Sequence, residues 1–210
     1  MAYRRTARVE MRLASNRARI LRAAKVLVSQ RGFRQAYMGA VAASAGMAIG
    51  TVYRYFPSKS DLFAEVVATT SAREVGVVAE LATGHGPAAK RLAEGIRAFV
   101  LRAIRGRGLA YALIAEPSEP PVNAVRLRYR QELSKVLEGI VSDGIRDGEF
   151  PPQDAEVTAS CLVGAFLEAL VRPLAPTAEP LRGNAEALVD AIVTFCVRAV
   201  RAVAEIDIHG

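Results

Sequence analysis

Residues 38–59 read MGAVAASAGMAIGTVYRYFPSK, and this stretch decides the fold. Apolar residues at three- and four-residue spacing predict a short helix, a turn at residues 44–47, and a second short helix. Gly46 is suited to the left-handed conformation that ends a helix sharply, and the alanines before it let two helices approach closely. The stretch therefore predicts a helix-turn-helix. The side chains that its second helix exposes are Thr51, Tyr53, Arg54 and Tyr55.

The residues on either side predict two further helices around this pair. A preceding amphipathic helix is indicated by its apolar spacing and ends at Gly32. Pro57 forces the backbone of Phe56 out of helical geometry, so three short helices precede it. Ser58 and Asp61 have the spacing of an acidic capping box and start a long fourth helix, which runs to about residue 82.

The rest of the chain also has helical periodicity. The predicted helices cover residues 87–104, 109–115, 123–148, 154–172 and 184–205, with Asn123, Asp154 and Asn184 as N-caps. Alternating β-branched runs bounded by hairpin turns are absent from the sequence. We predict an all-α fold of about nine helices, in which an N-terminal three-helix domain is joined to a C-terminal helical bundle. The predicted divisions are a basic arm (1–15), a helix-turn-helix domain (16–62) and the bundle (63–210).

The positive charge is concentrated at the N-terminus. Residues 1–62 hold 12 Lys and Arg against two acidic residues, whereas the remaining residues hold 16 against 19. Such an asymmetry favours a polyanionic partner, either nucleic acid or an anionic membrane. A solvated arginine-rich tail has the same composition, so charge alone leaves the three interpretations open.

Several classes of protein have no support in the sequence. It has no glycine-rich phosphate loop, nucleophile elbow or metal-ligand spacing, and its only histidines are His85 and His209. We therefore expect no catalytic residue, no bound metal and no cofactor. No signal-peptide pattern or long uninterrupted apolar run is present, which predicts a soluble cytoplasmic protein. Cys161 and Cys196 lie in apolar segments, so we expect two buried free thiols.

At this point the sequence closely resembles the TetR family of transcriptional regulators. The resemblance implies a dimeric repressor that binds operator DNA through its helix-turn-helix and responds to a small-molecule effector. The residues that carry it, in register over residues 20–62, are Ile20-Leu21, Ala23-Ala24, Leu27, Gly32-Phe33, Val41-Ala42, Ala45-Gly46, Gly50, Thr51, Val52, Tyr53, Tyr55-Phe56, Ser58-Lys59 and Leu62.

The resemblance also implies which residues contact DNA. A threonine offers a hydroxyl to a phosphate and a methyl to thymine, and Tyr53 offers a ring and a hydroxyl. Lys59 is expected to pair with a phosphate beside the free N–H groups of a helix N-terminus. We assign Phe56 to the core. The predicted DNA-binding residues are Ile49, Gly50, Thr51, Tyr53, Arg54, Tyr55 and Lys59.

Four positions depart from the family pattern. Tyr37 stands where the cap before the first helix of the pair is usually Thr or Ser, and Gly39 stands at a position that is often polar. Ala48-Ile49 opens the recognition helix, where a polar pair is common. We therefore expect either that Ile49 contacts thymine methyls or that specificity depends on Arg54 and the N-terminal arginines. The arginines near the N-terminus form either an arm that enters the minor groove or a solvated tail. They are Arg4, Arg5, Arg8 and Arg12.

For the C-terminal domain, the resemblance implies a bundle that dimerises and binds the effector. We expect helices 123–148 and 154–172 to form a four-helix homodimer interface with their symmetry mates. The composition favours an apolar or aromatic effector. The predicted ligand-binding residues are Phe99, Tyr111, Glu116, Tyr129 and Phe166.

Two alternatives remain beside this hypothesis: a helical protein that binds a membrane surface, and a basic protein that binds nucleic acid without sequence preference. The first needs one helix with a continuous cationic face, whereas Arg12, Arg17, Arg19 and Arg22 are spread around the helical wheel. We therefore expect no membrane partner.

Overall fold

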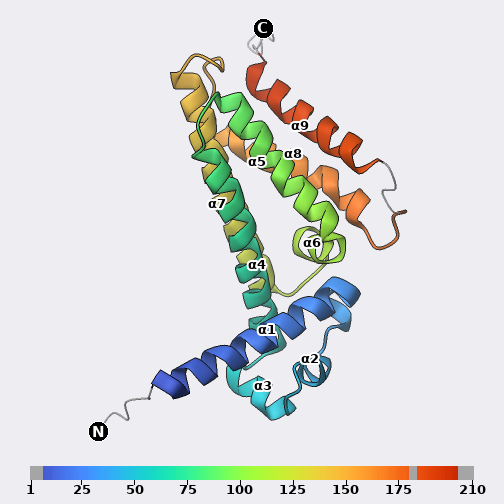
Figure 1. The fold of residues 1–210 in the computed structure, drawn as a ribbon. Coiled ribbons are helices and arrows are strands. Elements are labelled where there is room, and N and C mark those ends of the chain that lie inside the picture. Colours follow the sequence, from blue (N-terminus) through green and yellow to red (C-terminus); the bar gives the residue numbers. More distant parts are fainter. Residues whose placement is uncertain (1–6, 180–183, 203–210) are drawn as a thin grey trace.

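The computed structural model describes residues 7–179 and 184–202, which form helices joined by turns and loops (Figure 1). The described residues contain no strand, so the all-α prediction is confirmed. The helices are α1 Ala7–Gln35, α2 Met38–Ser44, α3 Ile49–Tyr55, α4 Lys59–Ala82, α5 Ala88–Arg105, α6 Arg107–Ile114, α7 Pro120–Arg146, α8 Ala155–Leu174 and α9 Ala185–Arg201.

Several helix ends differ from the predicted ones. α7 begins three residues before Asn123, because Pro120 fits the first turn of a helix, where no N–H partner is needed. Asn123 is thus not an N-cap, and its side-chain amide donates to the carbonyl oxygen of Ser118 at 3.0 Å. Asp154 does cap α8 and accepts from the N–H of Val157 at 2.9 Å. Asn184 precedes α9 but its side chain makes no capping bond.

The start of α4 agrees with the predicted capping box. The Ser58 hydroxyl oxygen accepts from the Asp61 N–H at 3.0 Å, and the Asp61 carboxylate accepts from the Ser58 N–H at 3.1 Å. These reciprocal bonds satisfy N–H groups that have no partner inside the helix. They fix the point at which α4 leaves the helix-turn-helix.

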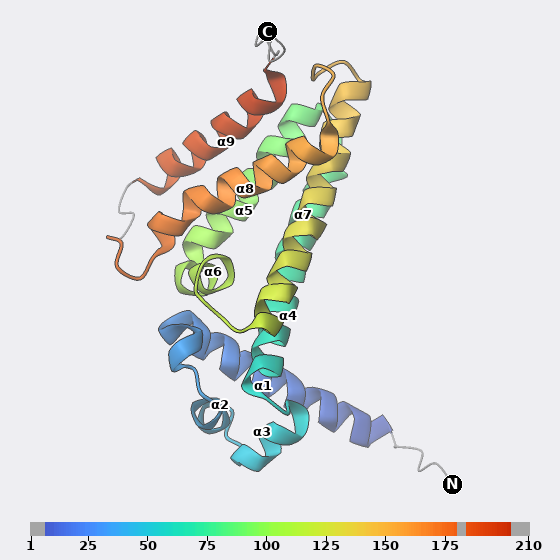
Figure 2. The same cartoon turned by 180° about the vertical axis from the view of Figure 1, so that it is seen from behind.

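α1, α2 and α3 form a compact group at one end of the molecule (Figures 1 and 2). Their apolar faces meet in a first core that also contains Leu62, Val66 and Val67 from the start of α4. Ala112 from α6 and Val122 from α7 belong to the same core. Burial of apolar surface therefore joins the N-terminal domain to the C-terminal one.

The second core lies among α4, α5, α6, α7, α8 and α9. Its largest fully buried side chains include Leu92, Leu137 and Phe166. α8 is long and apolar enough to cross a membrane by length and composition alone, but Phe166 and Leu170 on it are buried in this core. We therefore assign α8 as a core helix.

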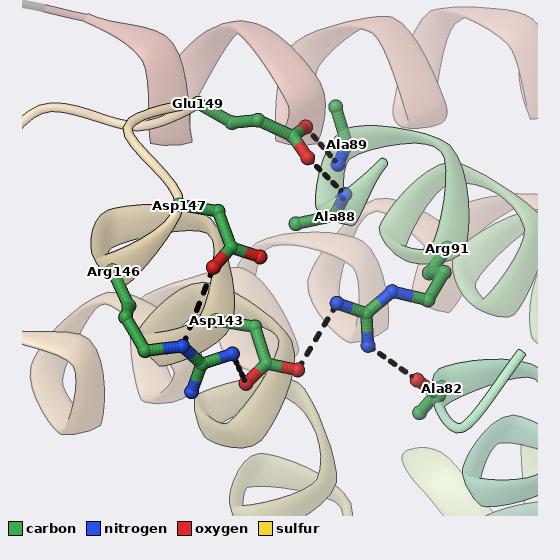
Figure 3. Close-up of polar contacts among 8 residues, drawn as sticks. All are labelled: Ala82, Ala88, Ala89, Arg91, Asp143, Arg146, Asp147 and Glu149. Atoms are coloured by element: carbon green, nitrogen blue, oxygen red, sulfur yellow. Dashed lines mark hydrogen bonds and ion pairs between the residues drawn. The ribbon is translucent and has the colours of Figure 1, made fainter. Parts of the chain in front are cut away.

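A polar cluster joins α4, α5 and α7 at the end away from α3 (Figure 3). Arg91 donates to the carbonyl oxygen of Ala82 at 2.6 Å and to Asp143 at 3.0 Å. The Glu149 carboxylate accepts from the first two N–H groups of α5, at 2.7 and 3.2 Å, and so caps a helix whose own N-cap, Pro87, makes no side-chain bond. These bonds fix the far end of α4 to the bundle.

Candidate DNA-binding surface and ligand cavity

The turn between α2 and α3 has the predicted geometry. Gly46 has a φ of 60°, in the left-handed region, and the Arg19 guanidinium donates to its carbonyl oxygen at 3.1 Å. Val52 and Phe56 are buried in the first core, as predicted for Phe56. α3 is therefore anchored by one apolar face, which leaves the opposite face exposed.

The exposed face of α3 carries four of the predicted DNA-binding residues. Ile49 is 48% exposed and Tyr53 is 45% exposed, which is unusual for large apolar or aromatic side chains. Gly50 and Arg54 are also exposed, and Thr51 is half-buried at the edge of this face. The surface combines methyl groups, an aromatic ring and a guanidinium.

The structure turns the other two predicted residues toward the protein. The Tyr55 hydroxyl accepts from the side-chain amide of Asn16 at 3.1 Å, which ties α3 to α1. The Lys59 ammonium donates to the carbonyl oxygen of Arg34 at 3.4 Å and lies 5.6 Å from the centre of the Phe63 ring. In this arrangement Tyr55 and Lys59 position α3 and α4, and the Lys59 ammonium keeps further N–H donors beside the one that it gives to Arg34.

Sequence reasoning did not include Tyr37 in the site. Its side chain is 59% exposed, and both its ring and the end of Ile49 lie within 4.0 Å of the position of a Cβ on Gly39. Gly39 leaves room for the two side chains to stand on one surface. The departure from the family pattern at Tyr37 and Gly39 was the signal that indicated this surface.

The cations around α3 come mainly from α1. Arg8 and Arg12 are exposed and lie on α1, which begins at Ala7; Arg4 and Arg5 of the predicted arm lie outside the described residues. Arg17 forms an ion pair with Glu65 at 2.8 Å and stacks on Phe56, so it has a structural role.

A cavity of about 290 Å³ lies in the C-terminal domain, lined by residues of α1, α4, α5, α6, α7 and α8. Apolar side chains, among them Val75, Leu113 and Leu133, form most of its wall. Two buried polar atoms on the lining have no hydrogen-bond partner within the described residues, Thr70 Oγ1 and Arg126 Nε. Such atoms are costly to bury, and each keeps a hydrogen-bonding capacity that the described residues leave unused.

The lining is strongly cationic. Glu74 binds Arg102 through two N–H groups, at 2.5 and 2.9 Å, and this pairing raises the pKa of Arg102. The other charged residues of the lining are cations that form no ion pair with a described residue: Lys25, Arg73, Arg126 and Arg130. No local sequence pattern predicted this cluster, because its members come from three helices.

The structure places only some of the five predicted ligand-binding residues at the cavity. Phe99 and Tyr129 line the cavity, and Phe166 stands behind Phe99 with ring centres 5.2 Å apart. Tyr111 packs against the second core and is not on the lining. Glu116 is also absent from the lining, because its carboxylate is occupied at the junction between the domains.

At that junction, Glu116 accepts hydrogen bonds from the backbone N–H groups of Phe33 at 3.0 Å and Arg34 at 3.4 Å. The chain turns there because Gly32, with a φ of 72°, interrupts α1. Arg126 from the cavity wall stacks over the Phe33 ring at 5.5 Å. The side chains that lie between the cavity and the helix-turn-helix domain therefore include those of Glu116, Phe33 and Arg126.

The outer face of α8 and α9 exposes large apolar side chains. Val157 is 57% exposed, and Phe195 on α9 is 58% exposed. Phe166 and Leu170 lie on α8, one of the helices of the predicted interface, but are buried in the protomer. Cys196 is buried as expected, but Cys161 is exposed on α8, so the prediction of two buried thiols was wrong for Cys161.

The protein thus consists of a helix-turn-helix domain joined to a helical domain that contains a cavity. This architecture defines a class of proteins, the two-domain DNA-binding regulators. No group of three or more His, Cys, Asp or Glu suited to a metal occurs among the described residues. Residues 20–66 match the model of the bacterial regulatory proteins of the tetR family, and residues 110–193 match the tetracyclin repressor-like C-terminal domain. The two matches cover more than half of the chain, which belongs to the TetR family of transcriptional regulators.

Individual relatives agree with this assignment. The HTH-type transcriptional repressor KstR of Rhodococcus jostii (strain RHA1) is 48% identical over 52 residues, which are 25% of this chain and 24% of that protein. The chain is thus matched to only about a quarter of the length of this curated relative.

Solved structures are similar over most of the chain. The fatty acid degradation regulator FadR of Bacillus halodurans has a TM-score of 0.73 at 17% identity, covering 86% of this chain and 97% of that one. FadR of Bacillus subtilis, in complex with stearoyl-CoA, has a TM-score of 0.71 at 20% identity, covering 84% and 97%. At these identities the two structures show the fold alone.

Proposed function

We propose that this protein is a cytoplasmic homodimeric repressor, which binds operator DNA through α3 and is released by a small amphipathic effector. The observation that carries the proposal is the position of α6. This helix contributes Leu109, Leu113 and Ile114 to the cavity wall, while Ala112 on it is buried in the core of the helix-turn-helix domain. An occupant of the cavity therefore acts on a helix that also supports α1.

The DNA contact rests on the exposed face of α3. A B-DNA major groove is about as wide as one helix, and Ile49, Tyr53 and Arg54 stand on the side that would enter it. Ile49 and the ring of Tyr53 suit thymine methyls, whereas Arg54 suits a guanine edge or a phosphate. Tyr37 would extend the same surface toward the adjacent backbone.

The dimer contact is assigned to the outer face of α8 and α9. Val157 and Phe195 are large apolar side chains that a second copy would cover, and small exposed residues such as Gly164 and Ala191 allow close helix packing. A twofold axis there would place two copies of α3 on the same duplex, about one helical turn or roughly 34 Å apart.

The effector class is inferred from the cavity. Its apolar wall suits an acyl chain or ring, and its volume lies near the lower end of the usual range of about 300–1,000 Å³. The similar structure of Bacillus subtilis FadR was solved with stearoyl-CoA. We therefore propose an acyl-type amphiphile, and no catalytic step, since binding alone shifts the population of DNA-competent dimers.

A selection from random duplexes with the purified protein tests the DNA-binding part of the proposal. The enriched duplex and a scrambled one would then be titrated with wild type, Tyr53→Ala and Leu127→Ala, with fluorescence anisotropy at several salt concentrations. Leu127 is a matched control because it is an exposed apolar residue outside α3. Hexanoyl-, dodecanoyl- and stearoyl-CoA would be added to the preformed complex.

We expect tight binding to the selected duplex, loss of at least about tenfold in affinity for Tyr53→Ala, and no change for Leu127→Ala. At least one acyl-CoA should weaken binding. Equal binding of wild type to selected and scrambled duplexes would instead support a basic protein without sequence preference. Tight binding unaffected by every acyl-CoA would contradict the proposed effector while leaving the operator function intact.

A further inference from the structure

Arg126 stands between the cavity and the helix-turn-helix domain. It lines the cavity, yet its guanidinium donates to the carbonyl oxygen of Ala112 and to the side-chain oxygen of Asn123, the latter at 2.9 Å. The Cζ atom of Arg126 lies 5.5 Å from the centre of the Phe33 ring. One side chain therefore contacts α6, α7 and the end of α1.

The guanidinium of Arg126 is not fully satisfied by these bonds. A guanidinium has five N–H donors, and the buried Nε has no partner among the described residues. Burial lowers the pKa of Arg126, and this effect exceeds the opposing effect of the Glu116 charge. An anionic ligand group in the cavity would therefore accept a hydrogen bond from the free Nε–H of Arg126. It would also lie beside a guanidinium whose positive charge is poorly compensated.

Glu116 connects this cation to the DNA-binding domain. Its carboxylate holds the N–H groups of Phe33 and Arg34, and Phe33 carries the ring on which Arg126 stacks. A second carboxylate from the same loop, Glu119, accepts from the Ser60 hydroxyl in the first turn of α4. The loop between α6 and α7 is thus hydrogen-bonded to both helices that hold α2 and α3.

We propose that Arg126 recognises the anionic group of the amphipathic effector, and that Glu116 transmits its occupancy to α1. The inference rests on the proposed function and specifies its recognition and regulation. A bound carboxylate or phosphate draws the guanidinium from Phe33 and Ala112 and repels the Glu116 carboxylate. Both changes loosen the end of α1 and the support of α3. The far end of α4 remains fixed by Arg91 and cannot follow.

The recognition step is tested without DNA. Dodecanoate, dodecanoyl-CoA and dodecanol share one chain length but differ in their headgroups, and calorimetry would give their affinities for wild type, Arg126→Gln and Arg128→Gln. Arg128 is the matched control, because it is an arginine on the same helix that is exposed and is not on the cavity lining. Circular dichroism would check that each variant is folded.

We expect wild type and Arg128→Gln to prefer at least one of the two anionic ligands to dodecanol by about tenfold or more, as for a charge-assisted hydrogen bond. Arg126→Gln should lose this preference while its affinity for dodecanol stays within about twofold. Preference for dodecanoate identifies a carboxylate headgroup, and preference for dodecanoyl-CoA alone identifies the phosphates. An undiminished preference in Arg126→Gln, or no anionic preference in wild type, overturns the assignment of Arg126.

The transmission step uses the selected operator duplex. Glu116→Gln keeps a side-chain acceptor but removes the charge, so we expect it to bind the anionic ligand within about threefold of wild type. The ligand-induced loss of operator affinity, typically about 5- to 150-fold in such couplings, should fall at least fivefold. Full coupling in Glu116→Gln overturns the role of Glu116. Because ligand-free operator binding is measured separately, failure of this step is distinct from failure of the repressor function.

Discussion

The carboxylate of Glu116 occupies the space beside Gly32 that any larger residue would need. A Cβ built on Gly32 would stand 2.5 Å from Glu116 Oε1. Gly32 also has a φ of 72°, a conformation that residues with a Cβ adopt only under strain. Gly32 is thus required both for the turn at the end of α1 and for the contact between the domains.

Replacement of Gly32 by alanine should therefore destabilise the fold by about 1–3 kcal/mol. The melting temperature, followed by circular dichroism, should fall by roughly 2–4 °C per kcal/mol for a chain of this size. Gly139→Ala is the control, because Gly139 lies in α7 with no neighbouring atom within 4 Å of the added Cβ. Alanine there should raise stability by up to about 1 kcal/mol. Equal melting temperatures for the two variants would argue against the strain at Gly32.

Arg54 on the exposed face of α3 should contribute to DNA affinity. We expect Arg54→Ala to weaken operator binding by about 1–3 kcal/mol if the residue reads a base edge. If Arg54 contacts a phosphate, scrambled duplex should be weakened equally and the salt slope reduced by about one. Anisotropy titrations against salt distinguish the two cases. Arg105→Ala, an exposed arginine at the end of α5, should change neither quantity.

Asp143 gives the polar cluster of Figure 3 a defined pH dependence. Hydrogen bonds from Arg146 and then Arg91 lower its pKa below the ordinary value of 3.8. The folded state therefore favours the charged carboxylate. The resulting stability is present above about pH 3.8 and is lost as the pH falls through the lower, folded-state pKa.

Asp143→Asn should lower the free energy of unfolding by about 1 kcal/mol at neutral pH, and the difference from wild type should shrink below about pH 3.8. Urea titrations at several pH values measure this difference. Asp147→Asn is the control, because Asp147 is 52% exposed and, within the part of the chain that the structure describes, has only one ion pair, with Arg146 at 3.3 Å. A deficit in Asp143→Asn that is independent of pH would show that the charge of Asp143 does not stabilise the cluster.

The proposed dimer surface is tested at Phe195. Phe195→Asp should convert the protein to a monomer in light scattering at micromolar concentration, since it places a charge where a partner would bury apolar surface. Leu127→Asp is matched in exposure, 59% against 58%, and should leave the dimer intact. A dimer that persists in Phe195→Asp would place the interface elsewhere.

Thiol labelling reports on the same surface. Burial raises the pKa of Cys196 to about 11, so this thiol is protonated and inert toward a maleimide at neutral pH. Cys161 is exposed on α8 in the protomer. We expect Cys161 to be labelled slowly in the wild-type dimer and rapidly in Phe195→Asp. Rapid labelling of both proteins would mean that no partner covers Cys161.

Much of the helix-turn-helix domain was determined by the sequence alone. Apolar spacing, Gly46, Pro57 and the Ser58–Asp61 pair are local signals, because a helix and its ends are decided by residues within a few positions of one another. The same signals placed Phe56 in the core and Tyr53 on the surface. Local pattern thus predicted the exposure of Tyr53 and Arg54 on α3, but not that Tyr55 turns toward α1.

Only the tertiary structure decided which residues meet in the C-terminal domain. Glu116 was expected in a ligand pocket, but it binds N–H groups 82 and 83 positions earlier in the chain. The cationic lining that includes Lys25, Arg73 and Arg126 joins three helices, and Phe195 rather than Phe166 is exposed. Helical periodicity gives each helix an apolar face, but which helix covers that face depends on packing between distant segments, and this was set by the folded chain.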